Sequence, residues 1–427
     1  MPYAYWFAVW VGAAAVIGAA WIVRLAAMSR AIRHRKVLSA HTYLGPPDPP
    51  PRVCVLVAAR NEQDHIETCL TSLLGQDYPD FEVIAVDDRS SDATPQILRC
   101  LLGAHADRLT VITIETLPEG WTGKSHALAE GVKVASGDWL CFTDADCRQI
   151  SARTLTMAVR DATLYNADLM TLTPVIEMRS IWEKGIQPVC AMTLMAWFRP
   201  RHANNPKQTT AYANGAFMLV RRGCYEAIGG HARVSGAINE DIQLARCAKD
   251  AGYRLRVVEN DDLYRTIMYT SIVDAWRGWS RIFCALPSPW HVAVAMASIL
   301  LFAMAPWVSL ITAVIGRTGA APENTLSWNA ALFAWAAVVV LMQFMAWRFY
   351  GLLKVNRFWS LAYVIGATAT CMVLGNTLLK VTGLSRTTWR GTTYGGGTKW
   401  VSDPEAWSPA LEEGESKTES KMGQENR

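Results

Sequence analysis

Apolar and polar positions form two different patterns along the chain. Four runs carry no charged side chain and are each long enough to cross a bilayer as a helix: residues 1–23, 291–316, 327–347 and 358–379. From residue 52 to about residue 265, short apolar runs alternate with segments of helical periodicity. This alternation predicts a mostly parallel β-sheet with helices on both faces. We therefore expect an α/β domain joined to membrane-spanning helices.

The apolar runs place the individual elements of the α/β domain. Strands are predicted at residues 53–59, 81–86, 109–114, 138–142 and 214–220. Helices are predicted at residues 62–74, 92–102, 124–135 and 242–251. Asp92 is expected to cap the second helix, because its carboxylate can accept the free N–H groups of the first turn.

One apolar segment, residues 181–200, fits neither pattern cleanly. Pro188 interrupts it, and it is too short and broken to predict a membrane span. It is interpreted either as a core helix or as an interfacial helix that receives a lipid. The clustered methionine and tryptophan side chains favour the interfacial helix.

Charge and proline patterns indicate where the parts of the chain begin and end. Basic residues follow the first apolar run and place that end on the cytoplasmic side: Arg24, Arg30, Arg33, Arg35 and Lys36. The proline-rich residues 45–51 indicate a stiff linker. We expect a membrane anchor with a basic segment at residues 1–45 and an α/β domain at residues 46–265. An amphipathic interface segment at residues 266–289, membrane helices at residues 290–385 and a polar, partly disordered tail at residues 386–427 are expected to follow. The side of the membrane that holds the tail stays open, because strict alternation and the basic residues after the last run disagree.

Composition agrees with a membrane protein and gives no sign of several other classes. Charged residues make up 18% of the chain, below the roughly 25% of soluble domains. The net charge of +4 is small, so no nucleic-acid partner is expected. The ten cysteines are scattered without a Cys-x-x-Cys pair, so neither a zinc site nor a disulfide framework is predicted. We expect a multi-pass protein of the plasma or inner membrane, with the α/β domain on the cytoplasmic face.

Acidic and amide side chains follow three of the predicted strands: Asn61 and Glu62, Asp87 and Asp88, and Asp144 and Asp146. The carboxyl ends of parallel strands are where open α/β sheets bind ligands. Asp144 and Asp146 lie two residues apart, so on an extended chain they point to the same side. Such a pair can hold Mg²⁺ or Mn²⁺, and that cation can clamp a diphosphate. For any one of these motifs alone, a solvated acidic turn is the alternative.

Glycine-rich phosphate motifs are missing from the sequence. No Gly-x-Gly-x-x-Gly follows the first strand, and the Gly-Lys-Ser at residues 123–125 lacks the spacing of a phosphate loop. Lys124 nevertheless opens a predicted helix, where free N–H groups favour an anion. It is interpreted either as a phosphate contact or as a surface lysine.

Two later segments carry candidate catalytic residues. Glu240 and Asp241 open the helix predicted at residues 242–251, either because acidic residues suit a helix start or because one is a general base that faces the metal site. Arg277 and Arg281 lie in an aromatic and basic segment ahead of a membrane run. They either mark a membrane interface or neutralise a departing diphosphate.

The ordered motifs between residues 52 and 265 resemble glycosyltransferase family 2, a group of inverting enzymes with a GT-A fold. The matching motifs lie at residues 58–62, 86–94, 123–128, 143–146, 214–215, 229–231 and 240–241. Residues 117–124 and 389–394 add a resemblance to membrane-bound members that glycosylate carotenoid or hopanoid-type lipids. The fold that the resemblance implies is a GT-A domain, a Rossmann-like α/β domain.

The resemblance also implies a role for each matching residue. Nucleotide-sugar binding is implied for Ala59, Asn61, Glu62, Asp87, Asp88, Lys124 and Asp144. Asp144 and Asp146 would hold Mg²⁺ or Mn²⁺, and Asp241, beside Glu240, would deprotonate the acceptor hydroxyl for a single inverting displacement. The implied donor is a UDP-sugar, with an aspartate at the uracil edge, and the implied acceptor is a lipid at the cytoplasmic membrane face.

One segment departs from the pattern of a subgroup. Processive polysaccharide synthases of the family carry Gln-x-x-Arg-Trp before their membrane spans, whereas residues 276–281 read Trp-Arg-Gly-Trp-Ser-Arg. This favours transfer of a single sugar to a lipid and leaves the diphosphate contact open between Arg277 and Arg281. The alternatives are a processive synthase and a non-catalytic membrane scaffold or sugar-nucleotide sensor. The joint presence of Asp144, Asp146 and Asp241 argues against an inactive protein.

Overall fold

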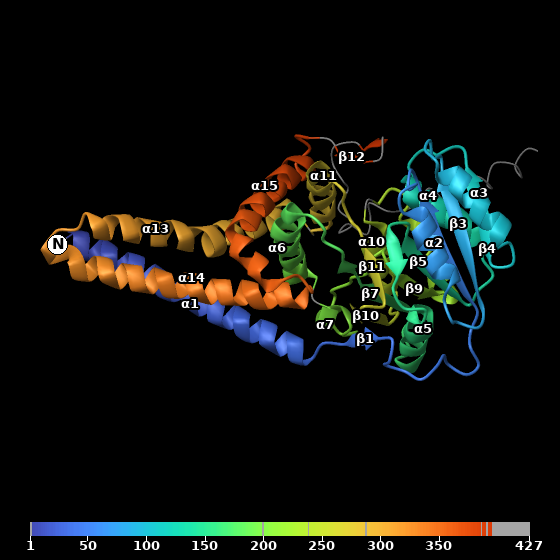
Figure 1. Cartoon of the computed structure of the whole chain (residues 1–427), viewed down its shortest axis with the longest axis horizontal. Coiled ribbons are helices and arrows are strands. Elements are labelled where there is room, and N and C mark those ends of the chain that lie inside the picture. The colour runs from blue at the N-terminus through green and yellow to red at the C-terminus, as the bar shows by residue number, and fades with distance from the viewer. Residues whose placement is uncertain are drawn as a thin grey trace, which may run out of the picture.

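A computed structural model describes residues 2–198, 200–237, 239–286, 288–385, 387–389 and 392–394. Figure 1 shows an elongated molecule, with a domain of strands and helices at one end and long helices that extend from it to the other end. The expected combination of an α/β domain with apolar helices is confirmed.

The α/β domain is built on an eight-stranded sheet. Its strands are β1 (Val37–Ser39), β2 (Val53–Ala59), β3 (Phe81–Asp88), β4 (Leu109–Ile114), β5 (Trp139–Asp144), β7 (Leu169–Thr173), β9 (Met218–Arg221) and β10 (Leu255–Asp261). Their order is β1-β10-β7-β9-β5-β2-β3-β4, and β9 alone runs antiparallel to its neighbours in this sheet. A smaller sheet combines β6 (Cys147–Gln149), β11 (Tyr264–Thr266) and β8 (Val175–Ile176).

The central strands are apolar along most of their length, as expected for strands that are covered on both faces. The side chains of Val55, Leu56 and Leu140 are fully buried. The domain's helices are α2 (Ile66–Leu74), α3 (Thr94–Ala104), α4 (Gly123–Val134), α5 (Thr154–Leu164), α7 (Pro200–Ala203), α8 (Arg222–Ala227), α9 (Gly230–Arg233) and α10 (Glu240–Asp250). Helix α4 lies close to β2 and β3 because Gly131 has no side chain; a Cβ there would lie 2.9 Å from Leu56.

Four helices of the described chain are long and apolar enough to cross a membrane, at Tyr5–Arg33, Pro289–Thr318, Pro322–Leu352 and Arg357–Val381. They contain α1 (Pro2–Arg33), α12 (Pro289–Ile299), α13 (Ala305–Thr318), α14 (Thr325–Leu352) and α15 (Tyr363–Val381). Helices α1 and α13 pack along α14 and extend away from the sheet, whereas α15 leaves at an angle (Figure 1). Each of the four spans overlaps one of the four uncharged runs.

Two further helices lie between the sheet and the long helices. Helix α6 (Ile181–Trp197) packs against α15, where the backbone carbonyl of Gly185 contacts Gly366. Ile181 at its start and Met195 near its end are exposed, so the helix has both the core contact and the apolar surface that the sequence left as alternatives. Helix α11 (Ile272–Ile282) buries Ala275 and Trp279 on one face and exposes Asp274 and Arg277 on the other, as an amphipathic helix does.

Some predicted bounds were wrong. Helix α2 begins at Ile66 rather than residue 62. The N-cap of α3 is Ala93 rather than Asp92, although an Asp92 oxygen does accept the Thr94 N–H at 2.9 Å. Strand β1 precedes the proline-rich segment and pairs with β10, so the sheet includes part of residues 1–45, which were expected to form the membrane anchor and its basic segment. The tail at residues 386–427 lies outside the described residues, apart from the paired strands β12 (Thr387–Trp389) and β13 (Thr392–Tyr394).

Candidate active site

Three parallel strands bring the predicted acidic residues to one edge of the sheet. Ala59 at the end of β2 pairs with Asp87 of β3, and Ala58 pairs with Asp144 of β5. Asp87 and Asp88 are 2% and 3% exposed. The shared register therefore gathers these carboxylates where α/β sheets bind their ligands.

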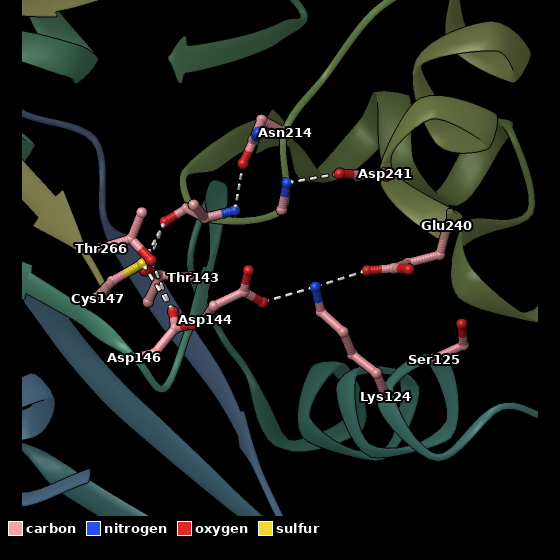
Figure 2. A network of polar contacts seen from close by, with 12 residues as sticks. Lys124, Ser125, Thr143, Asp144, Asp146, Cys147, Asn214, Glu240, Asp241 and Thr266 are labelled. Carbon is pink, nitrogen blue, oxygen red and sulfur yellow. Dashed lines mark hydrogen bonds and ion pairs between the residues drawn. The ribbon is translucent and has the colours of Figure 1, made fainter. Parts of the chain in front are cut away.

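Lys124 connects two carboxylates that come from opposite sides of this edge. Its Nζ lies 2.6 Å from Oδ1 of Asp144 and 2.7 Å from Oε1 of Glu240 (Figure 2). Lys124 stands in the first turn of α4, whose N-cap Thr122 accepts a hydrogen bond from the Ser125 N–H. The start of α4, the end of β5 and the start of α10 thus meet at one ammonium group.

The charges of this cluster shift two pKa values. Burial disfavours the Lys124 ammonium and is the largest single effect, but the combined attraction of Asp144, Glu240 and Asp241 raises the pKa of Lys124 above its ordinary value. For Asp241, loss of hydration and the nearby Glu240 outweigh the attraction of Lys124 and raise its pKa to about 6. A carboxyl group that titrates near the working pH suits a general base.

Backbone N–H groups orient the Asp241 carboxylate. The N–H of Gly215 donates to Oδ2 at 2.8 Å, and the N–H of Ile242 donates to Oδ1 at 2.8 Å. Glycine at position 215 leaves room for the Lys124 ammonium, because a Cβ there would lie 2.6 Å from Nζ and would displace it. The matching Asn-Gly motif therefore supplies both a hydrogen bond and the space that the charged cluster needs.

The loop at residues 214–216 is tied to the end of β5. The hydroxyl of Thr143 donates to the carbonyl of Ala216 at 2.8 Å, and the Ala216 N–H donates to Oδ1 of Asn214 at 2.9 Å (Figure 2). These bonds hold Gly215, and through it Asp241, at a fixed place relative to Asp144.

Asp146 lies in the turn between β5 and β6. Its Oδ1 accepts a hydrogen bond of 3.0 Å from the hydroxyl of Thr266 on β11 (Figure 2). The same residue lines a cavity of about 860 Å³ between the sheet edge and the helices α11 and α15. Asp146 therefore connects the charged cluster to the cavity.

The cavity combines residues from the α/β domain with residues from the membrane side. The α/β side supplies Arg60, Asn61, Glu62 and Asp146. The other side supplies Trp276, Arg277, Asn376 and Lys380. Of the two candidate arginines, the structure places Arg277 in this cavity, and Arg281 is not among its lining residues.

The loops after β2 and β3 are tied together. Asn61 has a left-handed φ of 54°, and its Oδ1 accepts the Ser91 N–H at 2.8 Å. Asp87 accepts the Ser90 N–H at 3.2 Å, and the Asn61 N–H donates to the hydroxyl of Ser90 at 3.0 Å. The side chain of Glu62 is 7% exposed. These hydrogen bonds join the two loops where Asn61 and Glu62 line the cavity.

Asp88 is held by two arginines and faces the start of α4. Its carboxylate lies 2.8 Å from Nε of Arg89 and 3.9 Å from Arg60. It approaches α4 where Gly123 has no side chain, since a Cβ there would collide with the Asp88 carboxylate. The glycine of the Gly-Lys motif therefore allows the strand end and the helix start to meet.

Sequence reasoning missed the contribution of the last membrane helix to the cavity. Lys380 closes an apolar run and reads as a residue of the membrane interface. Asn376 did carry a signal, because a polar side chain inside an apolar run indicates a buried contact or a functional role.

Asp144 and Asp146 are the candidate metal ligands. Among the described residues, no group of three or more histidine, cysteine or acidic side chains is arranged to hold an ion. A Mg²⁺-type ion binds through one or two carboxylates when substrate phosphates and water complete its shell. The pair therefore fits an ion that binds together with a diphosphate.

Comparison with known sequences agrees with this geometry. The profile of the family described as glycosyl transferase family 2 matches residues 54–229, which include β2, β3, β5 and the Asp144–Asp146 turn. The chain carries a glycosyltransferase family 2 domain. The residues of this domain contribute Lys124, Asp144 and Asp146 to the site, whereas Glu240 and Asp241 follow it.

Two curated relatives illustrate the similarity. The beta-monoglucosyldiacylglycerol synthase of Trichormus variabilis is 30% identical over 201 residues, which cover 45% of this chain and 40% of that protein. The 4,4'-diaponeurosporenoate glycosyltransferase of Staphylococcus aureus is 25% identical over 230 residues, which cover 53% of this chain and 59% of that protein. The match therefore spans about half the length of these relatives.

Among solved structures, a mannosyltransferase from Pyrobaculum calidifontis in complex with GDP-Man and Mn²⁺ is 22% identical and covers 86% of this chain. The match covers 98% of that protein with a TM-score of 0.48.

Proposed function

We propose that the chain is a membrane-bound, metal-dependent, inverting glycosyltransferase that moves one sugar from a nucleotide-sugar to a lipid. The observation that carries this proposal is the meeting of Asp144, Glu240 and Asp241 around Lys124, beside a cavity that reaches the apolar helices. The family 2 domain supports the reaction class. The two relatives are named for a glucosyldiacylglycerol and for diaponeurosporenoate, which supports a lipid acceptor.

Asp241 is the proposed base. It takes the proton of the acceptor hydroxyl while that oxygen attacks the anomeric carbon, and the diphosphate leaves with the electrons of the broken C–O bond. One displacement inverts the anomeric centre, so no covalent nucleophile is needed. Its raised pKa, about 6, lets Asp241 accept a proton more readily than an ordinary aspartate.

The donor's diphosphate is proposed to lie in the cavity that Asp146 lines. Arg277 on α11 lines the same cavity and offsets the negative charge that develops on the leaving group. Mg²⁺ or Mn²⁺ at Asp144 and Asp146 would supply Lewis-acid assistance to the same leaving group. For the base of the nucleotide we propose uracil, with Asp87 or Asp88 at its polar edge.

The acceptor is proposed to arrive from the membrane. The cavity is lined by α11 and α15, and α11 exposes apolar side chains such as Ile272 and Val273. The basic residues after the first span support a cytoplasmic position of the α/β domain, through the positive-inside bias.

The proposal is tested with membranes that contain the full chain. They are incubated with a panel of radiolabelled UDP- and GDP-sugars, and the lipids are extracted and sized. Label in one lipid species of fixed size is expected, from a UDP-sugar, and Asp146→Asn membranes should transfer none. A ladder of polymer lengths would instead indicate a processive synthase, and no transfer or hydrolysis of any donor would indicate a scaffold or sensor.

A further inference from the structure

The end of α15 is fastened to α11 by hydrogen bonds to one buried serine. The Asn376 side chain donates to the hydroxyl of Ser280 at 2.9 Å, and the Thr377 hydroxyl donates to the Ser280 carbonyl at 3.1 Å. Ser280 and Thr377 are fully buried. The last membrane helix is therefore held in a defined position against the amphipathic helix that carries Arg277.

This attachment places two cations in the cavity. Lys380 follows Asn376 by about one turn of α15, and Arg277 precedes Ser280 by about one turn of α11. Both line the cavity that Asp146 lines. Arg277 and Arg281 also lie close enough to Lys380 to repel its charge.

Neither cation has a carboxylate partner within ion-pair distance among the residues that the structure describes. The acidic residue on α11, Asp274, accepts a hydrogen bond of 2.6 Å from the hydroxyl of Ser271, the N-cap of this helix. Like charges that are held together without a counter-ion are costly, and an anion between them removes that cost.

We propose that Lys380 and Arg277 form a phosphate subsite, which takes the diphosphate of the nucleotide-sugar opposite Asp146. This inference rests on the proposed function and adds to it a donor contact from the last membrane helix. The donor's diphosphate then lies between Asp146 of the α/β domain and the helices α11 and α15, so that binding of the donor stabilises the contact between the membrane helices and the α/β domain.

A lysine at the end of a membrane helix can also serve only to reach the interface, and a phosphate can come from an anionic lipid headgroup. The test therefore measures binding of the diphosphate directly. The full chain, solubilised in a neutral detergent with Mg²⁺, is titrated calorimetrically with UDP and separately with uridine. The variants are Lys380→Gln, Lys380→Arg and the control Lys354→Gln.

The control is matched in charge and place. Lys354 follows the end of α14 and pairs with Asp261 and Asp262, away from the cavity lining. Loss of a charged hydrogen bond from a partly exposed lysine should weaken UDP binding about tenfold. Lys380→Gln is expected to show this loss without a change in uridine affinity, whereas Lys380→Arg and Lys354→Gln should bind UDP as the wild type does.

Each other outcome overturns the inference in a different way. Equal UDP affinity in wild type and Lys380→Gln would refute the subsite and leave the proposed function intact. If wild type binds no nucleoside diphosphate with any base, the proposed function fails with it. In nanodiscs, anionic lipid can be compared with zwitterionic lipid for its effect on the rate of sugar transfer. If Lys380→Gln loses only the stimulation of transfer by anionic lipid, the phosphate belongs to a headgroup and the diphosphate assignment is wrong.

Discussion

Replacement of Asp241 by asparagine separates catalysis from folding. The change removes the proposed base but keeps the size and shape of the side chain. A general base contributes about 10²- to 10⁴-fold to a rate, equivalent to about 3–5 kcal/mol of transition-state stabilisation. We expect Asp241→Asn to lose sugar transfer by that factor.

The structure predicts a small effect on stability. The asparagine oxygen can keep one of the two backbone hydrogen bonds, from Gly215 or Ile242, and loss of the other costs about 0.5–1.5 kcal/mol. Removal of the charge also ends the repulsion by Glu240 that helps to raise the pKa of Asp241, which offsets part of that cost. Lys124 still has Asp144 and Glu240 as partners.

The assay compares initial rates of transfer of a radiolabelled sugar to extracted lipid with the midpoint of thermal unfolding. Asp250→Asn is a suitable control, because Asp250 ends the same helix and is exposed. The control should retain wild-type rates. Transfer above one tenth of the wild-type rate by folded Asp241→Asn would refute Asp241 as the base.

Three further results follow from the charged cluster and from α11. The value of kcat/KM should rise with pH through a midpoint of about 6, because Asp241 must lose its proton to act as a base; a flat profile from pH 5 to 7 would contradict this. Lys124→Met should remove the cation that stabilises the Asp241 carboxylate. The midpoint of the profile of kcat/KM against pH is therefore expected to lie at a higher pH in this variant. Chemical denaturation should show a loss of about 1–2 kcal/mol, less than for a fully buried ion pair because the lysine side chain is 34% exposed. Gly278→Ala should destabilise the protein by about 1–3 kcal/mol, because the new methyl group overlaps the Tyr269 ring; an unchanged unfolding midpoint would show that α11 can move away.

The sequence predicted the strands best where they are covered on both faces. Strand β2 occupies Val53–Ala59 as predicted, because a buried central strand leaves an uninterrupted apolar run. Helix α2 was predicted to begin four residues early, since the polar residues before Ile66 continue its periodicity while the chain around Asn61 forms a left-handed turn. Periodicity does not report that backbone conformation.

The candidate site, too, could be predicted from the sequence only in part. The carboxylates after the strands could be predicted to meet, because parallel strands share an edge. The ion pairs of Lys124 with Asp144 and Glu240 depend on how α4 and α10 face each other, which no local pattern encodes. The same holds for Lys380, whose place in the cavity depends on the packing of α15 against α11.

We propose that Asp144 and Asp146 bind a divalent cation that would assist departure of the donor's diphosphate while the sugar is transferred to a lipid. The most direct measurement is label transfer to extracted lipid by wild-type and Asp146→Asn membranes, with excess EDTA and then with Mg²⁺ or Mn²⁺ restored. We predict that EDTA abolishes wild-type transfer, that the metal restores it, and that Asp146→Asn stays inactive in all conditions. Full wild-type transfer in EDTA, or full activity of Asp146→Asn, would contradict the account.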